Sequence, residues 1–157
     1  PDEVGWREAV SAWAWALRET LQKRPWALRI PITGPPTMPN NVRWMETGLR
    51  AMRGMGLNGG LRISLLLLLS GLVRWEVTMY DDLNTALKES GASEKEMLGG
   101  YGQLLTAVTD PAQFPEVHAL VNEKVFDDTG EPDDDFSFAL ELLLDGLETL
   151  VTRLDES

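Results

Sequence analysis

The sequence predicts an all-α protein, and three observations lead to this prediction. Apolar residues recur at steps of three and four along most of the 157-residue chain, which is the period of an amphipathic helix. No segment alternates apolar and polar residues as a half-buried strand does. Clusters of proline and glycine divide the chain into segments of helical length. A chain of this length fits one domain, residues 1–157, with a core of its own.

The first helix is expected over residues 4–23 and ends before Pro25, because proline disfavours helix in the residue that precedes it. Its apolar face is formed by Trp6, Val10, Trp13, Leu17 and Leu21. One helical turn is expected at residues 26–30, and a proline-rich connection follows. The next helix is expected from an asparagine N-cap at position 40 or 41 to residue 53.

Two longer helices are expected over residues 61–87 and 136–154, and both are apolar on two sides. The first carries a seam of Leu61, Leu65, Leu68, Leu72, Met79 and Leu83. The second carries a heptad seam of Phe136, Leu140, Leu143, Leu147, Leu150 and Leu154, and an additional apolar set of Phe138, Leu142 and Val151. A polar, mobile link at residues 88–96 and two shorter helices at 95–108 and 116–126 lie between them.

An ordinary surface helix needs one apolar stripe, so these two helices bury two sides. Either they are central helices of a monomer, or they pack on their own domain with one side and on a second copy with the other. We expect the second arrangement, a homodimer with a four-helix interface. The predicted contacts are Leu65, Leu68, Leu72, Leu140, Leu143, Leu147 and Leu150. Gly71 and Gly146 would allow close helix approach, unless they touch only neighbours in their own chain.

Composition excludes several kinds of chemistry. The chain has no cysteine, which excludes disulfides and thiolate chemistry and favours a reducing, cytoplasmic location. Its one histidine, His118, cannot form a multi-histidine metal site, and a surface or capping role is favoured. The apolar run at residues 65–69 is flanked by Arg62 and Arg74 and is shorter than the ~20 residues of a membrane span. We therefore expect no metal, no cofactor and no membrane insertion.

Charge is distributed unevenly. Residues 1–109 carry 12 Lys+Arg and 11 Asp+Glu, a net charge of +1, whereas residues 110–157 carry 2 and 14, a net charge of −12. A chain with a net charge of −11 repels phosphate backbones, so these residues should not bind nucleic acid by themselves. The acidic segment 127–135 does not fit the calcium-loop template and is expected to be a solvated loop that caps the final helix.

Motifs of enzymatic sites are not found. The sequence has no Glu-x-x-His pair, no phosphate-binding glycine motif and no G-x-S-x-G elbow. We therefore expect no catalytic residue and no enzymatic activity. An enzyme would need a cleft that joins Arg74, Glu76 and Tyr80 with shifted acidity, and a paired surface patch is favoured instead.

Several stretches resemble the regulatory domain of the TetR family of transcriptional repressors. The segment RIPITGPPT at residues 29–37 is similar to the family's connection before a pocket helix. The segment WMETGL at residues 44–49, with Gly56-Leu57, is similar to that helix and to its terminal turn. FSFALELLLDGLE at residues 136–148 resembles the family's final helix, F-x-x-G/A-L-E-L-x-x-x-G-L-E, and is the most specific of the three. The resemblance spans nearly the whole chain.

The resemblance implies an antiparallel helical bundle that dimerises and binds a small-molecule inducer. It also implies a helix-turn-helix domain before residue 1, which would bind operator DNA and release it when the inducer binds. By position, the ligand-binding residues would be Trp13, Leu17, Pro31, Gly34, Trp44, Met45, Gly48, Ile63 and Leu66.

One departure from the family pattern concerns the ligand. Pro31 stands where the tetracycline repressor has a magnesium-ligating histidine, and a proline side chain cannot ligate a metal. A magnesium–tetracycline complex is therefore not the expected ligand. Trp13 stands where the family has a polar contact residue, and this departure implies a largely apolar or aromatic ligand. The alternative is a helical dimeric adaptor that binds proteins and has no small-molecule pocket. A tightly filled core beside Trp13 and Met45 would favour this adaptor.

Overall fold

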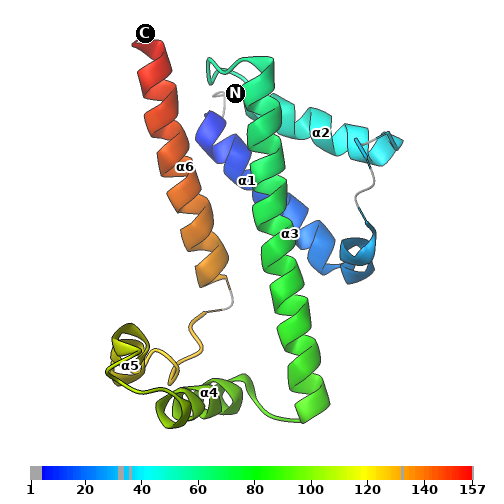
Figure 1. Cartoon of the computed structure of the whole chain (residues 1–157). Coiled ribbons are helices and arrows are strands. Elements are labelled where there is room, and N and C mark those ends of the chain that lie inside the picture. The colour runs from blue at the N-terminus through cyan, green and yellow to red at the C-terminus, as the bar shows by residue number, and fades with distance from the viewer. Residues whose placement is uncertain (1–4, 32–33, 36, 132, 157) are drawn as a thin grey trace. The chain divides into compact units, whose positions relative to one another are not determined.

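The computed structural model describes residues 5–31, 34–35, 37–131 and 133–156, and within them it contains helices and no strand (Figure 1). This confirms the all-α prediction. The elements are α1 (Trp6–Gln22), the 3-10 helix η1 (Pro25–Arg29), α2 (Pro39–Ala51), α3 (Gly59–Ser90), α4 (Glu94–Val108), α5 (Pro115–Asn122) and α6 (Asp134–Asp155).

The chain forms two compact units. Residues 1–81 and 135–157 make the first unit, which holds α1, η1, α2, most of α3 and almost all of α6. Residues 82–134 make the second unit, which holds the end of α3 together with α4 and α5. Within the first unit α3 and α6 run in opposite directions (Figure 1), as expected for an antiparallel bundle.

Local signals explain where the helices begin. Pro39 takes the first position of α2 after an extended Met38, where a proline's missing N–H costs nothing, so the predicted asparagine N-cap is wrong. Asn58 Oδ1 accepts a hydrogen bond from the Leu61 N–H at 3.0 Å, which lets α3 start at Gly59. Ser93 and Glu96 form a capping box at the start of α4. The predicted link at 88–96 is therefore shorter than expected, because α3 continues to Ser90.

The core of the first unit is built around α1. This helix packs against α2 and η1, contacts α3 through an Arg18–Glu76 ion pair, and contacts α6 where the Trp15 and Phe136 rings meet edge to face at 4.7 Å. The buried apolar side chains are Val10, Trp13, Ala14, Leu21, Met52, Met55, Leu57, Leu65, Leu66, Leu69, Val73, Val77, Phe136, Leu140, Leu144 and Leu147.

The second unit is smaller and is held by contacts between α4, α5 and the turn that follows α5. The Tyr101 and Phe126 rings meet edge to face at 5.4 Å, and Gly102 lies so close to Phe126 that an added Cβ would be 3.3 Å from it. His118 Nε2 lies 2.8 Å from Thr109 Oγ1 and 3.1 Å from the Thr109 carbonyl oxygen. The histidine thus binds the C-cap residue of α4, in agreement with a capping role.

One helix of the described chain, α3, is long and apolar enough to cross a membrane by length and composition alone. The core helix of a soluble protein passes the same test. Within α3, Glu76 is buried in an ion pair with Arg18 of α1, an arrangement suited to a protein core. About a third of the apolar window is buried, so much of its apolar surface remains exposed.

Candidate ligand-binding and dimerisation sites

A tryptophan cluster joins α1 to α2. The Trp13 ring is buried, and its indole N–H points at the Trp44 carbonyl oxygen at 3.2 Å and at Thr47 Oγ1 at 3.3 Å. The Trp13 and Trp44 rings meet at 70° with centroids 6.3 Å apart. A buried indole N–H needs a partner, and α2 supplies it. Two groups of α2, the Trp44 carbonyl and the Thr47 hydroxyl, therefore fix the orientation of Trp13.

Close packing at Gly48 brings α1, α2 and α3 together. A Cβ added to Gly48 would lie 2.4 Å from Leu66 Cδ1 and 2.9 Å from Trp13 Cε2. Any larger residue at position 48 would force one of these side chains to move. Three of the residues predicted to bind ligand therefore lie in mutual contact, and the space beside Gly48 is filled by Trp13 and Leu66.

The other residues predicted to bind ligand are dispersed. Leu17, Trp44 and Met45 are half-buried and pack against the core. Pro31 and Gly34, on the proline-rich connection, are exposed. Ile63 is also exposed, although Leu66 on the same helix is buried. The structure thus brings together the α1, α2 and Leu66 positions but leaves Pro31, Gly34 and Ile63 at the surface.

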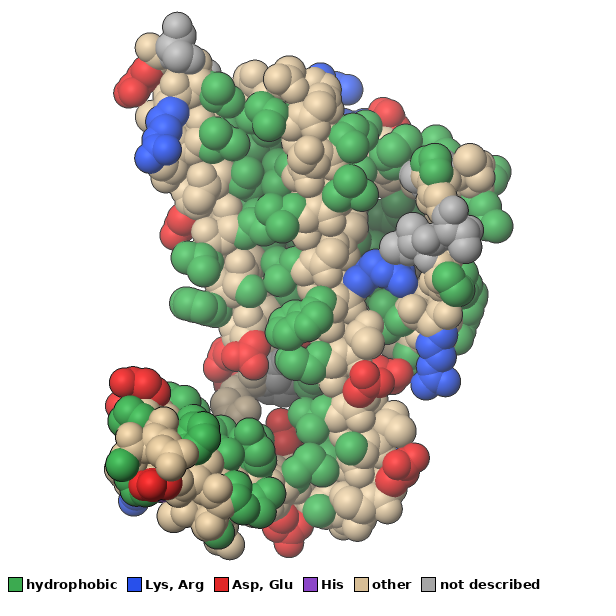
Figure 2. Space-filling model, viewed as in Figure 1, with side chains coloured by type: hydrophobic (Ala, Val, Ile, Leu, Met, Phe, Trp, Pro, Cys, Tyr) green, Lys and Arg blue, Asp and Glu red, His purple; other side chains and the backbone are tan. Residues whose placement is uncertain are grey.

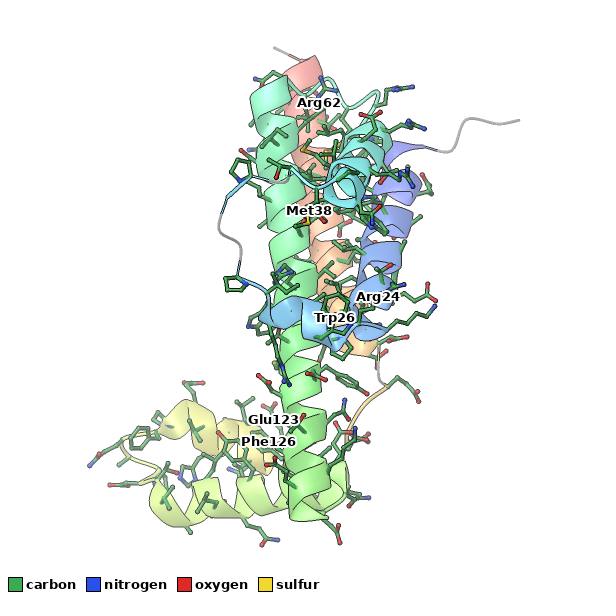
Figure 3. All side chains as sticks on the ribbon, turned by 90° about the vertical axis from the view of Figure 1, so that its right-hand side faces the viewer. Arg24, Trp26, Met38, Arg62, Glu123 and Phe126 are labelled. Atoms are coloured by element: carbon green, nitrogen blue, oxygen red, sulfur yellow. The ribbon has the colours of Figure 1, made fainter. Side chains whose placement is uncertain are left out.

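Figure 3 shows the described side chains in a view that has η1 toward the reader. Trp26 of η1 and Met38, which precedes α2, are both exposed and flank the proline-rich connection. Arg62 lies at the start of α3 (Figure 3), one helical turn before Leu66. Its Nε is buried and has no hydrogen-bond partner among the described residues. Sequence reasoning missed this atom, because nothing in the spacing distinguishes Arg62 from a solvated arginine.

Arg18 and Glu76 form a buried ion pair in the first unit. Arg18 Nε and Nη2 donate to Glu76 Oε2 and Oε1 at 3.0 and 2.9 Å, a two-point contact. The guanidinium also lies 5.3 Å from the centre of the Trp15 ring and 5.0 Å from that of Phe136. The pair therefore links α1, α3 and α6. No sequence pattern predicts this pair, because the two residues are far apart in the chain.

Two of the three residues considered for an enzyme, Arg74 and Glu76, have partners outside the trio. Glu76 is committed to Arg18, and Arg74 Nη2 donates to the Leu28 carbonyl oxygen of η1 at 3.2 Å. The two side chains therefore serve separate contacts. No group of three or more His, Cys, Asp or Glu residues in the described part of the chain is arranged to hold a metal ion.

Arg7 forms a second ion cluster, at the surface. Its guanidinium contacts three carboxylates of α6: Glu141 and Asp145 at 2.6 Å and Glu148 at 3.0 Å. These acids follow one another at steps of four and three and so share one face of α6. Hydrogen bonds to Asp145 and then Glu141 raise the pKa of Arg7 above its usual range. The cluster fastens the start of α1 to α6.

The residues predicted at the dimer interface fall into two groups in the structure, one buried in the core and one toward solvent. Leu65, Leu140 and Leu147 are buried in the core of their own chain, so they are not surface contacts of the described molecule. The inner face of α6 is Phe136, Leu140, Leu144 and Leu147, not the predicted seam through Leu143. Adjacent leucines at 143 and 144 satisfy the same spacing, and only packing against α1 and α3 selects one of them.

The remaining predicted contacts lie toward solvent. Leu68 and Leu150 are exposed, and Leu72 and Leu143 are half-buried. An open groove of about 500 Å³ runs between α3 and α6 and is almost entirely apolar. It is lined by Leu67, Leu68, Gly71, Leu72, Trp75, Ala139 and Leu143. Figure 2 shows hydrophobic side chains gathered along these two helices on one face of the first unit.

Comparison with known proteins defines the class. Residues 1–151 match the family described as "Tetracyclin repressor-like, C-terminal domain". The chain is also 31% identical over 153 residues to the HTH-type transcriptional repressor DrrR1 of Streptomyces coeruleorubidus. This match covers 95% of the chain and 54% of that repressor, so the chain spans about half the length of this relative.

The chain therefore belongs to the tetracycline repressor-like C-terminal domain family and is a TetR-type regulator domain. This confirms the family resemblance and the all-α fold, and it places the chain in a family of regulators that are not enzymes. Dimerisation and small-molecule binding are typical of this family.

Proposed function

We propose that this chain is the inducer-binding and dimerisation domain of a transcriptional repressor. The observation that carries the proposal is that the two sides of α3 have different surroundings. One side of the helix places Leu66 against Trp13 and Gly48, while the other side exposes Leu67, Leu68 and Trp75. The same helix thus contacts the tryptophan cluster on one side and offers an apolar surface to a second copy on the other. Family membership and the repressor relative support this assignment.

The proposed ligand is small and largely apolar or aromatic, and it enters beside the tryptophan cluster. Pockets for such ligands combine apolar walls with a few polar anchors. Trp13 and Trp44 provide the walls, and Thr47 Oγ1 and the unpartnered Arg62 Nε are candidate anchors. Because Trp13 and Leu66 fill the space beside Gly48, ligand entry requires one of them to move.

The proposed response to ligand is a movement of α1. Trp13 and Arg18 lie on this helix, and Arg7 lies at its start. A ligand that displaces Trp13 acts on the same rigid element that Arg18 and Arg7 hold to α3 and α6. A shift in the equilibrium between two positions of α1 is the coupling that an inducer needs. We propose that a helix-turn-helix domain precedes α1, that it binds operator DNA in the cytoplasm, and that ligand binding releases it.

Tryptophan fluorescence tests the ligand site. Titration of the chain with planar aromatic compounds such as naphthol or acridine should quench emission in a saturable way. Trp13→Phe and Trp44→Phe should each remove part of the quenching, whereas Trp75→Phe, on the outer side of α3, should leave it unchanged as the matched control. Quenching that is equal in all three variants would contradict a site beside Trp13.

A dimeric adaptor without a pocket remains the second candidate, and the close packing at Gly48 favours it. The inducer-binding domain and the adaptor differ in the effect expected from a larger residue at position 48. Gly48→Ala should abolish ligand quenching if the space opens for a ligand. In an adaptor, the same change should lower the stability of the fold and alter no small-molecule titration.

A further inference from the structure

Positive charge is concentrated in one continuous stretch of this acidic chain. Residues 20–75 carry eight Lys or Arg and one Asp or Glu, a net charge of +7, whereas all the other residues together carry a net charge of −18. The stretch forms the end of α1, then η1, the proline-rich connection, α2 and about the first half of α3. Trp44, Gly48 and Leu66 belong to it. The candidate ligand site therefore lies in the basic part of the first unit.

Three exposed arginines of this stretch have no counter-charge. Arg24, Arg43 and Arg53 have no ion-pair partner in the part of the chain that the structure describes. Arg24 precedes η1 (Figure 3), Arg43 lies on α2 and Arg53 follows α2. The single carboxylate of the stretch, Glu46, contacts Arg50 at 3.3 Å. The surface beside η1 and α2 is therefore positive and attracts anions, most strongly at low salt.

A fourth arginine, Arg62, reaches from this surface toward the core. The residue is half-buried, and its Nε is buried without a hydrogen-bond partner among the described residues. Arg62 precedes Leu66 by one helical turn, so the two share one side of α3, the side on which Leu66 meets the position of Gly48. An arginine side chain stays charged in proteins, and a buried donor without an acceptor is costly. A ligand can supply the acceptor that the described residues do not.

We propose that the ligand of the tryptophan cluster is an aromatic acid, whose carboxylate binds Arg62 and whose ring packs against Trp13 and Trp44. This inference rests on the proposed inducer site and specifies the chemical class of its ligand. The two oxygens of a carboxylate can accept two parallel hydrogen bonds from a guanidinium, including one from Nε. The exposed arginines attract the anion, and the tryptophan rings select its apolar part. A cationic ligand would be repelled by both sets of arginines.

Isothermal titration calorimetry of the whole chain tests the class with three probes that share one ring system. Naphthoate is an anion at neutral pH, naphthamide is its neutral counterpart, and naphthylmethylamine is a cation. Naphthoate should bind at least about tenfold more tightly than naphthamide, and the amine should bind more weakly than both. Raising the salt from ~0.05 M to ~0.5 M should remove only part of this preference, because salt screens the exposed arginines more than the buried contact. Inorganic phosphate should neither bind nor displace naphthoate.

Variants test the role of each arginine. Arg62→Met should abolish the preference for naphthoate and leave the affinity for naphthamide unchanged. It should not lower the urea midpoint of the ligand-free chain, because it removes an unpartnered buried donor, whereas loss of a structural contact would lower that midpoint. Arg43→Gln should weaken naphthoate binding at low salt only. Arg153→Gln is the matched control, because it makes the same charge change at an exposed arginine of α6 outside the basic stretch.

The outcomes separate the ligand class from the ligand site. Naphthamide or the amine binding as tightly as naphthoate would overturn the aromatic acid and leave the site in place. A preference for naphthoate that survives Arg62→Met at high salt would overturn Arg62 as the anchor. Binding of phosphate alone would assign the basic surface to an inorganic anion and overturn the proposal. No binding of any naphthalene compound would contradict both the site and the class.

Discussion

The two apolar faces of α6 have nearly the same composition and opposite environments. The inner face, Phe136, Leu140, Leu144 and Leu147, is almost completely buried against the core of its own chain. The outer face is exposed, and it consists of Phe138, Leu142, Leu150 and Leu154. The difference shows that hydrophobic spacing identifies faces that need a partner but does not say which partner each face has.

The largest expected effect comes from placing a charge on each face in turn. Leu140→Glu puts an unpaired carboxylate into the core and should cost more than about 5 kcal/mol, enough to unfold a typical domain. Leu142→Glu, two residues away on the exposed side, should leave the fold intact and abolish self-association. Circular dichroism and sedimentation measure the two outcomes. A folded Leu140→Glu variant would contradict the assignment of the inner face.

The contrast between Leu140 and Leu142 also shows which features of the fold can be predicted from the sequence. Helix number, approximate bounds and the two-sidedness of α3 and α6 follow from periodicity and from proline and glycine positions. The spacing could not decide whether Leu140 and Leu147 face the core or the dimer partner, because either apolar face of α6 has a spacing of three and four. The choice depends on α1, whose Trp15 packs on Phe136 and thereby sets the rotation of α6.

For the candidate ligand site, the family resemblance proposed Trp13, Gly48 and Leu66, which the structure places next to one another. It did not identify the partners that fix them, such as Thr47 beside the Trp13 indole. It also missed the buried Arg18–Glu76 pair. These interactions depend on tertiary distances between helices that share no sequence pattern.

The core against which the inner face packs also holds a buried charge pair, Arg18 of α1 with Glu76 of α3. Arg18→Met should leave Glu76 buried without its partner and cost about 3–5 kcal/mol in unfolding free energy. The double variant Arg18→Met, Glu76→Leu should recover most of this loss, because apolar residues can replace a buried pair. Urea denaturation of the two single variants and the double variant gives the coupling. Additive losses would contradict a paired interaction.

A smaller effect is expected from truncating one leucine on each face. Leu144→Ala removes a completely buried side chain and should cost about 2–5 kcal/mol. Leu142→Ala removes an exposed one and should change the stability of the isolated monomer by less than about 0.5 kcal/mol. Urea denaturation at low protein concentration checks both values. At higher concentration Leu142→Ala should lose stability relative to the wild type, because a dimer contact stabilises by mass action. An equal loss at all concentrations would contradict a dimer contact at Leu142.

The smallest effect is expected on the third, acidic face of α6, where solvent screens the interactions. Arg7→Gln removes the cation that joins Glu141, Asp145 and Glu148 to α1. The variant should unfold at a lower temperature than the wild type in dilute buffer, because three like charges then remain without their counter-charge. The difference should shrink toward zero in about 1 M salt, where the screening length falls to ~3 Å.

Lys23→Gln, which breaks an exposed pair with Glu19 within α1, is the matched control and should show a weaker salt dependence. A difference for Arg7→Gln that persists unchanged at high salt would mean that its packing, and not its charge, holds α1 to α6. The acidic face would then resemble the inner face, where contacts rather than charges decide stability.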